Sequence, residues 1–472
     1  MRLPLPPGPV AHPVLSVLHW MYEPQDFLER AAKRYGDPFT MKLPGTPTFV
    51  VFSNPEAVKE VFADDGHTMH AGKANVPLKP FLGEHSLLML DGDEHMRERR
   101  LLLPPFHGER MQAYGRTMIE LTNAALDRWT TGTPFALHGE LQAITLRIIV
   151  RTIFGIDDGP RFERFCEKLT RMTDIASWPW LILPVMQKDL GPLSPWGKFQ
   201  RIGAEVDATL METIAERRRA GTSGRTDILS MLVDARDENG KPMSDVELRD
   251  ELVTLLVAGH ETTATSIAWA LRWILDRRDV KARLMAEIAA TEATGELSPE
   301  RIAKLEYMDA VVRETMRLQP VIPLVGRVLQ KPANVGGWDL PAGSAVVCSI
   351  YLAQRRAQVY PNPTRFDPDR FMHKKFSPNE FFPFGGGIRR CVGMAFALYE
   401  MKMVLATLLV RTEMRLAPGK PVRAVRRAIT LTPSEGLRVI LDSRRPLSSH
   451  PLPHAENFAS TSRLRIPEGH TL

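Results

Sequence analysis

One segment of the chain combines the residue types needed to hold a reactive thiolate beside a ligand. Residues 384–393 read FGGGIRRCVG, and a helical pattern follows from Met394 to Val410. Glycines permit tight turns and close approach of the backbone to a flat ligand. Because Cys391 precedes a helix and lies beside arginines, the helix dipole and the positive charge favour its thiolate. From these residues alone, the cysteine is either a redox thiol or a small buried hydrophobic residue.

A second group of reactive side chains interrupts a long apolar helix. A capping box opens at Ser244, and the pattern predicts a proline-free helix of roughly 50 Å from there to about Arg277. Inside this helix, which we expect to be buried nearly all round, residues 258–263 read AGHETT where packing would favour leucine. An unpaired buried carboxylate is costly, so Glu261 requires a partner, water or an adjoining active-site cavity. The segment is therefore a functional site or a satisfied polar cluster. It is no HExxH zinc motif, because Ala264 stands where the second histidine would be.

The elements that must position these side chains indicate a mainly α fold with small β-sheets. The first hundred residues mix helical stretches with short extended runs such as 48–52, helical periodicity dominates from about 110 to 317, and strands return after that. Neither a linker nor an internal repeat divides the chain, which predicts one domain over residues 1–441 with a proline-rich lead-in at 1–14. Residues 442–472 lack periodicity and predict a flexible tail.

The overall composition excludes several classes of protein. The chain has 472 residues, of which 44% are hydrophobic and 25% charged, as expected of a globular protein with a large core. Its formal charge of +6 comes from short arginine clusters without interleaved aromatic residues, so we expect no nucleic-acid binding. No apolar run approaches the ~20 residues of a membrane span, and three widely separated cysteines fit a reducing compartment. A cytoplasmic protein without a transmembrane anchor is the expectation.

The spacing of the cysteine segment matches a known signature. The pattern FxxGxRxCxG is complete at Phe384, Gly387, Arg389, Cys391 and Gly393. It resembles the heme-binding signature of the cytochrome P-450 superfamily. The resemblance implies the fold of that family, with the long helix crossing the heme, and heme b as cofactor with Cys391 as the axial ligand of its iron. It extends over residues 15 to 441.

Two further motifs resemble those of the same family. Glu314 and Arg317 look like its ExxR element and can pair on one face of a helix, although an isolated pair of this kind is usually a solvated surface pair. Residues 366–371 read FDPDRF, and the resemblance implies that Arg370 joins Glu314 and Arg317 in a structural network.

The polar segment of the long helix is also explained by the resemblance. Residues 258–262 look like the oxygen-binding motif AGxET, in which Glu261 and Thr262 are implied to relay protons to bound dioxygen through water. Ala258 and Gly259 are implied to lie at the cofactor, with the glycine opening room above the iron. We expect His260, at a variable position of the motif, to be structural.

Four basic residues are implied to hold the heme propionates. His95 and Arg99 lie one helical turn apart in a charged helix, so both can point at one site. Arg327 and Arg389 match two further propionate contacts of the family, and arginine can bind carboxylates through two hydrogen bonds. The alternative for His95 is a surface position.

The implied reaction is a monooxygenation, in which one oxygen atom of O2 enters a substrate and the other leaves as water. Because no GxGxxG fingerprint is present, we expect electrons from a separate ferredoxin and a ferredoxin reductase fed by NAD(P)H. The arginines at positions 97, 100, 389 and 390 form a basic docking face for an acidic ferredoxin, or are solvated charges. We expect a monomer.

The substrate is expected to be lipophilic and fatty-acid, terpenoid or steroid-like, because the run PPFHGERM at 104–111 and the proline-rich start resemble such bacterial members. The candidates for an apolar pocket wall are Thr254, Leu255, Ala258, Val321, Ile322, Leu324, Val325 and Leu437. The apolar run at 177–184, which includes Trp180, forms either an entrance lid or part of the core.

Other functions of a heme-thiolate protein remain open. A peroxygenase or a hydroperoxide-rearranging enzyme needs no electron partner, and the intact pair of Glu261 and Thr262 argues against both. A heme sensor without turnover is the alternative from a different class.

Overall fold

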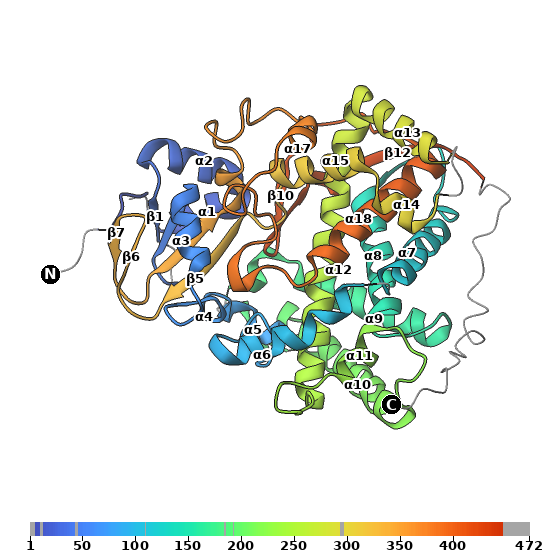
Figure 1. Cartoon of the computed structure of the whole chain (residues 1–472), viewed down its shortest axis with the longest axis horizontal. Helices are drawn as coiled ribbons and strands as arrows, with labels where there is room; N and C mark the ends of the chain where they lie inside the picture. Colours follow the sequence, from blue (N-terminus) through green and yellow to red (C-terminus); the bar gives the residue numbers. More distant parts are fainter. Residues whose placement is uncertain are drawn as a thin grey trace, which may run out of the picture.

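The computed structural model describes residues 5–9, 13–42, 46–108, 110–183, 186–191, 193–292 and 297–446. In Figure 1 the sheet with β1 and β5 lies beside α1, α2 and α3, and the helical part with α7, α8 and α14 lies on the other side. The expected combination of dominant helices and small sheets is confirmed.

The helices of the described residues have the following bounds: α1 Pro13–Tyr22, α2 Pro24–Tyr35, α3 Pro55–Ala63, α4 Ala71–Ala74, α5 Lys79–Leu82, α6 Gly92–Leu102, α7 Arg110–Leu126, α8 Leu137–Thr152, α9 Pro160–Ala176, α10 Pro195–Ala220, α11 Ile228–Asp234, α12 Asp245–Asp276, α13 Arg278–Glu292, α14 Pro299–Ala303, α15 Glu306–Leu318, α16 Ile350–Ala353, α17 Asp369–His373 and α18 Met394–Arg411. Short 3-10 helices include η3, Pro179–Ile182, and η5, Gly387–Arg389.

The strands have these bounds: β1 Phe39–Met41, β2 Phe49–Phe52, β3 Met69–His70, β4 Pro134–Ala136, β5 Leu324–Leu329, β6 Ala333–Val335, β7 Trp338–Leu340, β8 Ala345–Ser349, β9 Thr412–Leu416, β10 Ala424–Arg427, β11 Thr430–Pro433 and β12 Arg438–Arg444. The largest sheet has the order β1-β2-β8-β5-β3, and only the pairing of β2 with β8 is parallel within it.

The long helix predicted from the sequence is α12, which runs through the middle of the molecule (Figure 1). It starts with the predicted capping box, since the Ser244 hydroxyl accepts from the Glu247 backbone N–H and the Glu247 carboxylate accepts from the Ser244 N–H. It packs against α8, where the Thr145 hydroxyl donates to the carbonyl of His260 at 3.0 Å. Full burial was expected for its middle, but Ala258 is exposed there although Leu256 and Ala264 are buried. The accessible stretch coincides with the polar segment.

Two predicted boundaries need correction. Strand β12 extends to Arg444 and pairs there with Thr412 of β9, so regular structure continues beyond residue 441. Helix α1 begins at Pro13, inside the predicted lead-in of 1–14. Pro6 lies in that lead-in, and its carbonyl accepts a hydrogen bond from the Thr40 hydroxyl at 2.6 Å. The predicted flexibility of residues 447–472 lies outside the described residues.

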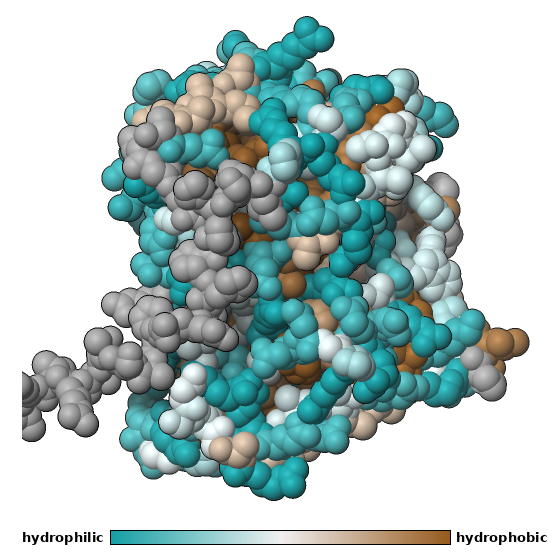
Figure 2. Space-filling model, turned by 90° about the vertical axis from the view of Figure 1, so that its right-hand side faces the viewer, coloured by the Kyte–Doolittle hydropathy of each residue, from teal (hydrophilic) through white to brown (hydrophobic). Residues whose placement is uncertain are grey.

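The face of the molecule shown in Figure 2 is mostly polar. Hydrophilic residues predominate on it, and hydrophobic residues form separate patches between them. In the part of the chain that the structure describes, no helix is both long and apolar enough to cross a membrane.

Candidate active site

The cysteine segment forms a tight loop directly before α18. The Cys391 N–H donates to the carbonyl of Phe384 at 3.0 Å, and the Gly385 N–H donates to the carbonyl of Phe382 at 2.9 Å. Gly393 is the N-cap of α18, and a Cβ built on it would lie 4.0 Å from the Cys391 sulfur. The loop therefore fixes the cysteine two residues before the helix cap.

The glycines of this loop serve packing within the protein. A Cβ on Gly386 would overlap the ring of Phe62 in α3, and a Cβ on Gly387 would overlap the Phe62 carbonyl oxygen. Gly387 also has a φ of +63°, which side chains rarely adopt. The expectation that these glycines approach a flat ligand is wrong for this pair, because α3 occupies the space beside them.

Cys391 is accessible although it lies deep in the fold. It is exposed, whereas Cys166 and Cys348 are buried. Burial of the surrounding segment raises the pKa of its thiol, while the Gly393 N–H and the charges of Arg99 and Arg390 act in the opposite direction. In the protein alone, desolvation outweighs the helix N-terminus and the arginines, which act in the predicted direction. An accessible sulfur inside the fold can nevertheless reach a ligand.

The four predicted propionate contacts face one another. His95 is 1% exposed, and its Nδ1 has no hydrogen-bond partner among the described residues. Burial, with the charges of Arg389, Arg99 and Arg327 acting in the same direction, lowers the pKa of His95 to about 3. The surface position considered for His95 is thus wrong. A buried histidine among three arginines is a site suited to anionic groups.

Arg389 points inward and meets the carboxylate of Asp91. It donates to the carbonyl of Leu87 at 3.2 Å and forms an ion pair with Asp91. Burial lowers the pKa of Arg389 to about 10, Asp91 opposes this effect, and the charges of Arg327 and Arg99 add to it. Arg327 donates to the Gly386 carbonyl at 3.2 Å. The three arginines outnumber Asp91 and Asp64, so the cluster keeps surplus positive charge, which suits the carboxylates of a heme.

Within the polar segment 258–263 of α12, the exposed residue is Ala258. The hydroxyl of Thr262 donates to the Ala258 carbonyl at 2.6 Å, and its side chain is partly exposed. A Cβ on Gly259 would lie 3.0 Å from the Cδ1 atom of Ile149 in α8. The role expected for the glycine needs correction, because its missing side chain makes room for α8. His260 is buried, and its Nδ1 lies 3.0 Å from the Leu256 carbonyl, in agreement with the expected structural role.

Glu261 has the partners that its position required. Its Oε2 atom accepts from Gln142 of α8, and its Oε1 atom lies 3.5 Å from Nε of Arg427 in β10. The Nε2 atom of His138 lies 3.9 Å from the same oxygen. Sequence reasoning missed these three neighbours, since no local pattern links them to α12. The carboxylate is held between a helix and a strand. The Glu261 side chain is 14% exposed, and its Oε1 atom is buried.

The predicted ExxR pair is an ion pair with no exposed surface. Nε and Nη2 of Arg317 donate to the two oxygens of Glu314 at 2.7 and 2.8 Å, and both side chains are 0% exposed. Arg370 contributes its Nε atom at 3.4 Å from Glu314. Arg317 also donates to the carbonyls of Pro363 and Arg365 at 2.8 and 3.1 Å. The pair thereby connects α15 to the segment that leads into α17.

The candidates for a pocket wall divide into two groups. Ala258 is exposed, and three residues after α15 are partly exposed: Ile322, Leu324 and Val325. Thr254, Leu255, Val321 and Leu437 are buried. The Thr254 hydroxyl lies 2.7 Å from that of Ser86, and Leu437 is 0% exposed within the core. The second group therefore offers little surface to a ligand in this conformation.

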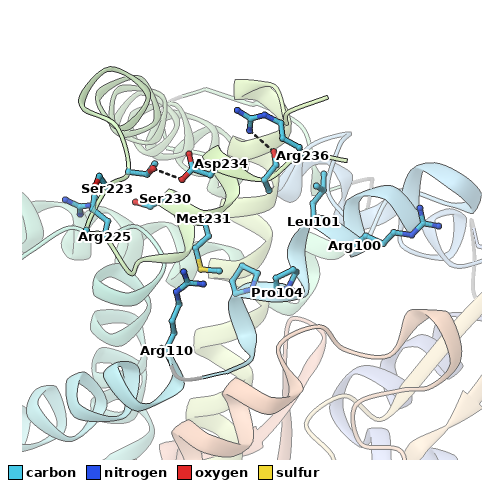
Figure 3. A pocket seen from close by; sticks show the side chains of 14 residues that line it. Arg100, Leu101, Pro104, Arg110, Ser223, Arg225, Ser230, Met231, Asp234 and Arg236 are labelled. Carbon is cyan, nitrogen blue, oxygen red and sulfur yellow. Dashed lines mark hydrogen bonds between the residues drawn. The ribbon is translucent and has the colours of Figure 1, made fainter. Parts of the chain in front are cut away.

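The predicted basic docking face is largely wrong. Arg97 pairs with Glu98, Asp237 and Glu247, and Arg389 points inward. Arg390 is exposed. Arg100 pairs with Glu238 at 2.9 Å and lines a hollow of about 550 Å³, shown in Figure 3. Three further arginines line it: Arg110, Arg225 and Arg236. Charge along the sequence did not reveal which arginines are already paired.

Comparison with known proteins identifies the class of protein. The family model for cytochrome P-450 matches residues 6–440, and the chain belongs to this family. It is 38% identical over 446 residues to cytochrome P-450 135B1 of Mycobacterium tuberculosis, covering 94% of this chain and 93% of that protein. It is 35% identical over 412 residues to cytochrome P-450 137 of the same organism, covering 87% and 84%.

Solved structures give the same result. The structure of a retinoic acid bound cyanobacterial CYP120A1 superposes with a TM-score of 0.81 at 27% identity, covering 94% of this chain and 100% of that one. The heme domain of cytochrome P450DA, at 24% identity, has the same TM-score and shows the fold. The chain is therefore a heme-thiolate monooxygenase whose cofactor is heme b.

Proposed function

We propose that Cys391 is the axial ligand of the heme iron and that the enzyme oxidises a lipophilic substrate. The observation that carries this proposal is that Cys391 is the exposed cysteine, while Cys166 and Cys348 are buried. It also lies in a loop held by the hydrogen bond from its own N–H to the Phe384 carbonyl. When bound, a heme with a thiolate ligand supplies the activation of O2 by which one oxygen atom enters a C–H bond.

The basic cluster would hold the cofactor by its propionates. His95 and Arg99 come from α6, Arg327 from β5 and Arg389 from the cysteine loop. The charges of Arg99 and Arg327 lower the pKa values of His95 and Arg389, and Asp91 and Asp64 balance only part of the positive charge. Two propionates would remove this repulsion and would give the Nδ1 atom of His95 a partner. Ala258 would face the bound cofactor from α12.

Glu261 and Thr262 would manage protons at this site. The Thr262 hydroxyl donates within its own helix at 2.6 Å and has a free lone pair with which to accept from water. The Glu261 side chain is partly exposed and would exchange protons with water, while Gln142 and Arg427 orient its carboxylate. The pair therefore supports oxygen reduction over a peroxygenase or a hydroperoxide rearrangement, which need no such relay.

Glu314, Arg317 and Arg370 would position the cysteine loop without touching substrate or cofactor. Arg317 binds the carbonyls of Pro363 and Arg365 in the segment that leads toward the loop.

The substrate class follows from apolar surface near the proposed heme site. Ile322, Leu324 and Val325 are partly exposed after α15, and Ala258 is exposed in α12. The cyanobacterial neighbour that was solved with retinoic acid, an apolar carboxylic acid, also supports a lipophilic substrate. Fatty acids, terpenoids and steroid-like compounds are the proposed candidates, with hydroxylation as the reaction.

Electrons would come from a ferredoxin and its NAD(P)H-fed reductase, since this chain carries no flavin or nicotinamide motif. We also propose a monomeric, cytoplasmic enzyme, because its three cysteines are free.

The test is turnover of the purified holoenzyme. Lipophilic compounds are screened for spin-state shifts of the heme, and those that bind are incubated with ferredoxin, reductase and NADPH, or with hydrogen peroxide alone. The proposal predicts an oxygenated product that depends on NADPH and O2. Product with peroxide but none with the reductase system would identify a peroxygenase, and no oxygen consumption with any ligand would identify a sensor.

A further inference from the structure

The hairpin of β10 and β11 carries two consecutive arginines that point in opposite directions. Arg427 lies 3.5 Å from Glu261 of α12 and 3.0 Å from Asp174 of α9. The guanidinium of Arg426 instead lies 4.2 Å from the ring centroid of Trp20 in α1. Successive side chains of a strand alternate between its faces, which explains the difference. Only one of the two arginines therefore has carboxylate partners.

Arg426 is a partly exposed residue whose guanidinium has no carboxylate partner among the described residues. Its Nε and Nη2 atoms are buried and have no hydrogen-bond partner among the residues that the structure describes. Burial lowers the pKa of Arg426 to about 10, and no neighbouring charge opposes it. The contact with Trp20 compensates a desolvated cation only in part. Leaving two charged donors without acceptors is unfavourable, so such a group is suited to an anionic ligand.

The two unpartnered atoms form one edge of the guanidinium. The spacing of their N–H groups matches that of the two oxygens of a carboxylate. Elsewhere in this protein the same edge binds carboxylates through paired hydrogen bonds. Arg317 uses Nε and Nη2 to bind Glu314 at 2.7 and 2.8 Å, and Arg277 uses them to bind Asp279 at 2.9 and 2.7 Å. At Arg426 this edge is accordingly suited to donate two hydrogen bonds to one carboxylate.

Exposed hydrophobic side chains lie on α1 and β10, the two elements that meet at Arg426. Leu18 and Tyr22 of α1 are 39% and 66% exposed, and Val425 of β10 is 38% exposed. The ring of Tyr22 lies 6.3 Å from that of Trp180 in η3, which belongs to the predicted lid. A ligand bound here would thus present a carboxylate to the arginine and an apolar body to α1 and η3.

The hairpin connects this position with the proposed active site. Leu431 pairs with Arg426 across the hairpin. Its N–H donates to the carbonyl of Val321 at 2.9 Å, and its carbonyl accepts from Nε1 of Trp269 in α12 at 2.9 Å. The strand that carries Arg426 is therefore fixed to α12 and to the apolar segment before β5.

We propose that Arg426 binds the carboxylate of the substrate, and that the preferred substrates are lipophilic carboxylic acids. This inference rests on the proposed function and specifies its substrate class. Arg426 determines specificity, since it lies on the opposite face of the hairpin from Glu261 and takes no part in proton transfer.

The experiment compares acids with their methyl esters on the holoenzyme. Spin-state titrations use hexadecanoic acid, abietic acid and cholic acid, each beside its ester, with the wild type, Arg426→Gln and Arg426→Lys. A charge-assisted pair predicts that Arg426→Gln weakens binding of the preferred acid about tenfold to a hundredfold and leaves its ester unchanged. Arg426→Lys restores part of the loss. Arg423→Gln, an exposed position just before β10, is the matched control and leaves both ligands unchanged.

Three results would overturn the inference. The wild type could bind no acid more tightly than its ester, or Arg426→Gln could weaken acid and ester equally, as a structural role would. Loss of binding to anionic phospholipid vesicles in Arg426→Gln, with acid binding intact, would assign the residue to a membrane surface. In any of these cases, NADPH-dependent oxidation of a neutral lipid would leave the proposed monooxygenase function standing. Failure of the Arg426 inference is thus distinguishable from failure of the proposed function.

Discussion

The carboxylate of Glu314 receives two hydrogen bonds, of 2.7 and 2.8 Å, from the guanidinium of Arg317, and neither side chain has any exposed surface. A buried pair of this kind adds little net stability compared with apolar residues, but removal of one partner leaves an uncompensated charge. Its value lies in the connection that Arg317 makes to the carbonyls of Pro363 and Arg365.

Arg317→Ala is therefore expected to destabilise the fold by about 3 to 5 kcal/mol, because Glu314 would keep a buried charge with fewer partners. Denaturant unfolding followed by far-UV circular dichroism measures this loss, and the yield of heme-loaded protein should fall with it. Arg313→Ala on the same helix is the control, since Arg313 pairs with Asp309 at the surface and should cost about 0 to 1 kcal/mol. Equal losses in both variants would contradict this interpretation of the buried pair.

His95→Ala is expected to weaken retention of heme. Loss of one charge-assisted hydrogen bond to a propionate should speed heme release about tenfold to a hundredfold. The transfer of heme to excess apomyoglobin gives the rate. Arg100→Ala, an exposed position on the same helix, should release heme at the wild-type rate. If both variants retained heme equally well, the basic cluster would not be the propionate site.

Glu261→Gln is expected to uncouple NADPH consumption from product formation. The amide keeps the shape of the side chain but cannot exchange a proton, so product formation should fall about 100-fold or more while hydrogen peroxide accumulates. Ser266→Ala is the control, because that hydroxyl donates to the Thr262 carbonyl one turn further along α12. Unchanged coupling in Glu261→Gln would exclude the proposed role.

The free energy of unfolding is expected to depend on pH through the carboxyl of Glu98. Burial raises the pKa of this carboxyl to about 7, Arg97 opposes the shift, and Glu247 adds to it. The carboxyl of Glu251, also buried, faces Glu98, and its own pKa is raised well above its usual value, chiefly by burial. The folded state therefore holds the proton of Glu98 more tightly than the unfolded state does, so stability falls as pH rises from about 4.5 to about 7.

Glu98→Gln removes this ionisation. The variant should be more stable than the wild type above pH 7, by up to about 3 kcal/mol, and the gain should vanish near pH 4.5. Urea midpoints at several pH values measure it, with Glu94→Gln as an exposed control on α6. A gain that does not change with pH would show that the carboxyl does not titrate in this range.

The residues that local patterns define were predictable from sequence. The cysteine loop, the ExxR pair and the capping box of α12 each lie within a few residues, so spacing alone brings their atoms together. The surroundings of Glu261 were not predictable, because Gln142 lies 119 residues away and Arg427 belongs to a later strand. Likewise, nothing local shows that Arg389 turns inward to Asp91, 298 residues away. Long-range packing decides which charges meet.

The central claim is the bond between the sulfur of Cys391 and the heme iron, and the carbon monoxide spectrum of the reduced enzyme tests it most directly. The wild type should show the strongly red-shifted Soret band of a thiolate-ligated heme. Cys391→Ala should lack that band, while Cys166→Ala, at a buried cysteine, should keep it. A wild-type enzyme without the shifted band, or a Cys391→Ala variant that retains it, would contradict the claim.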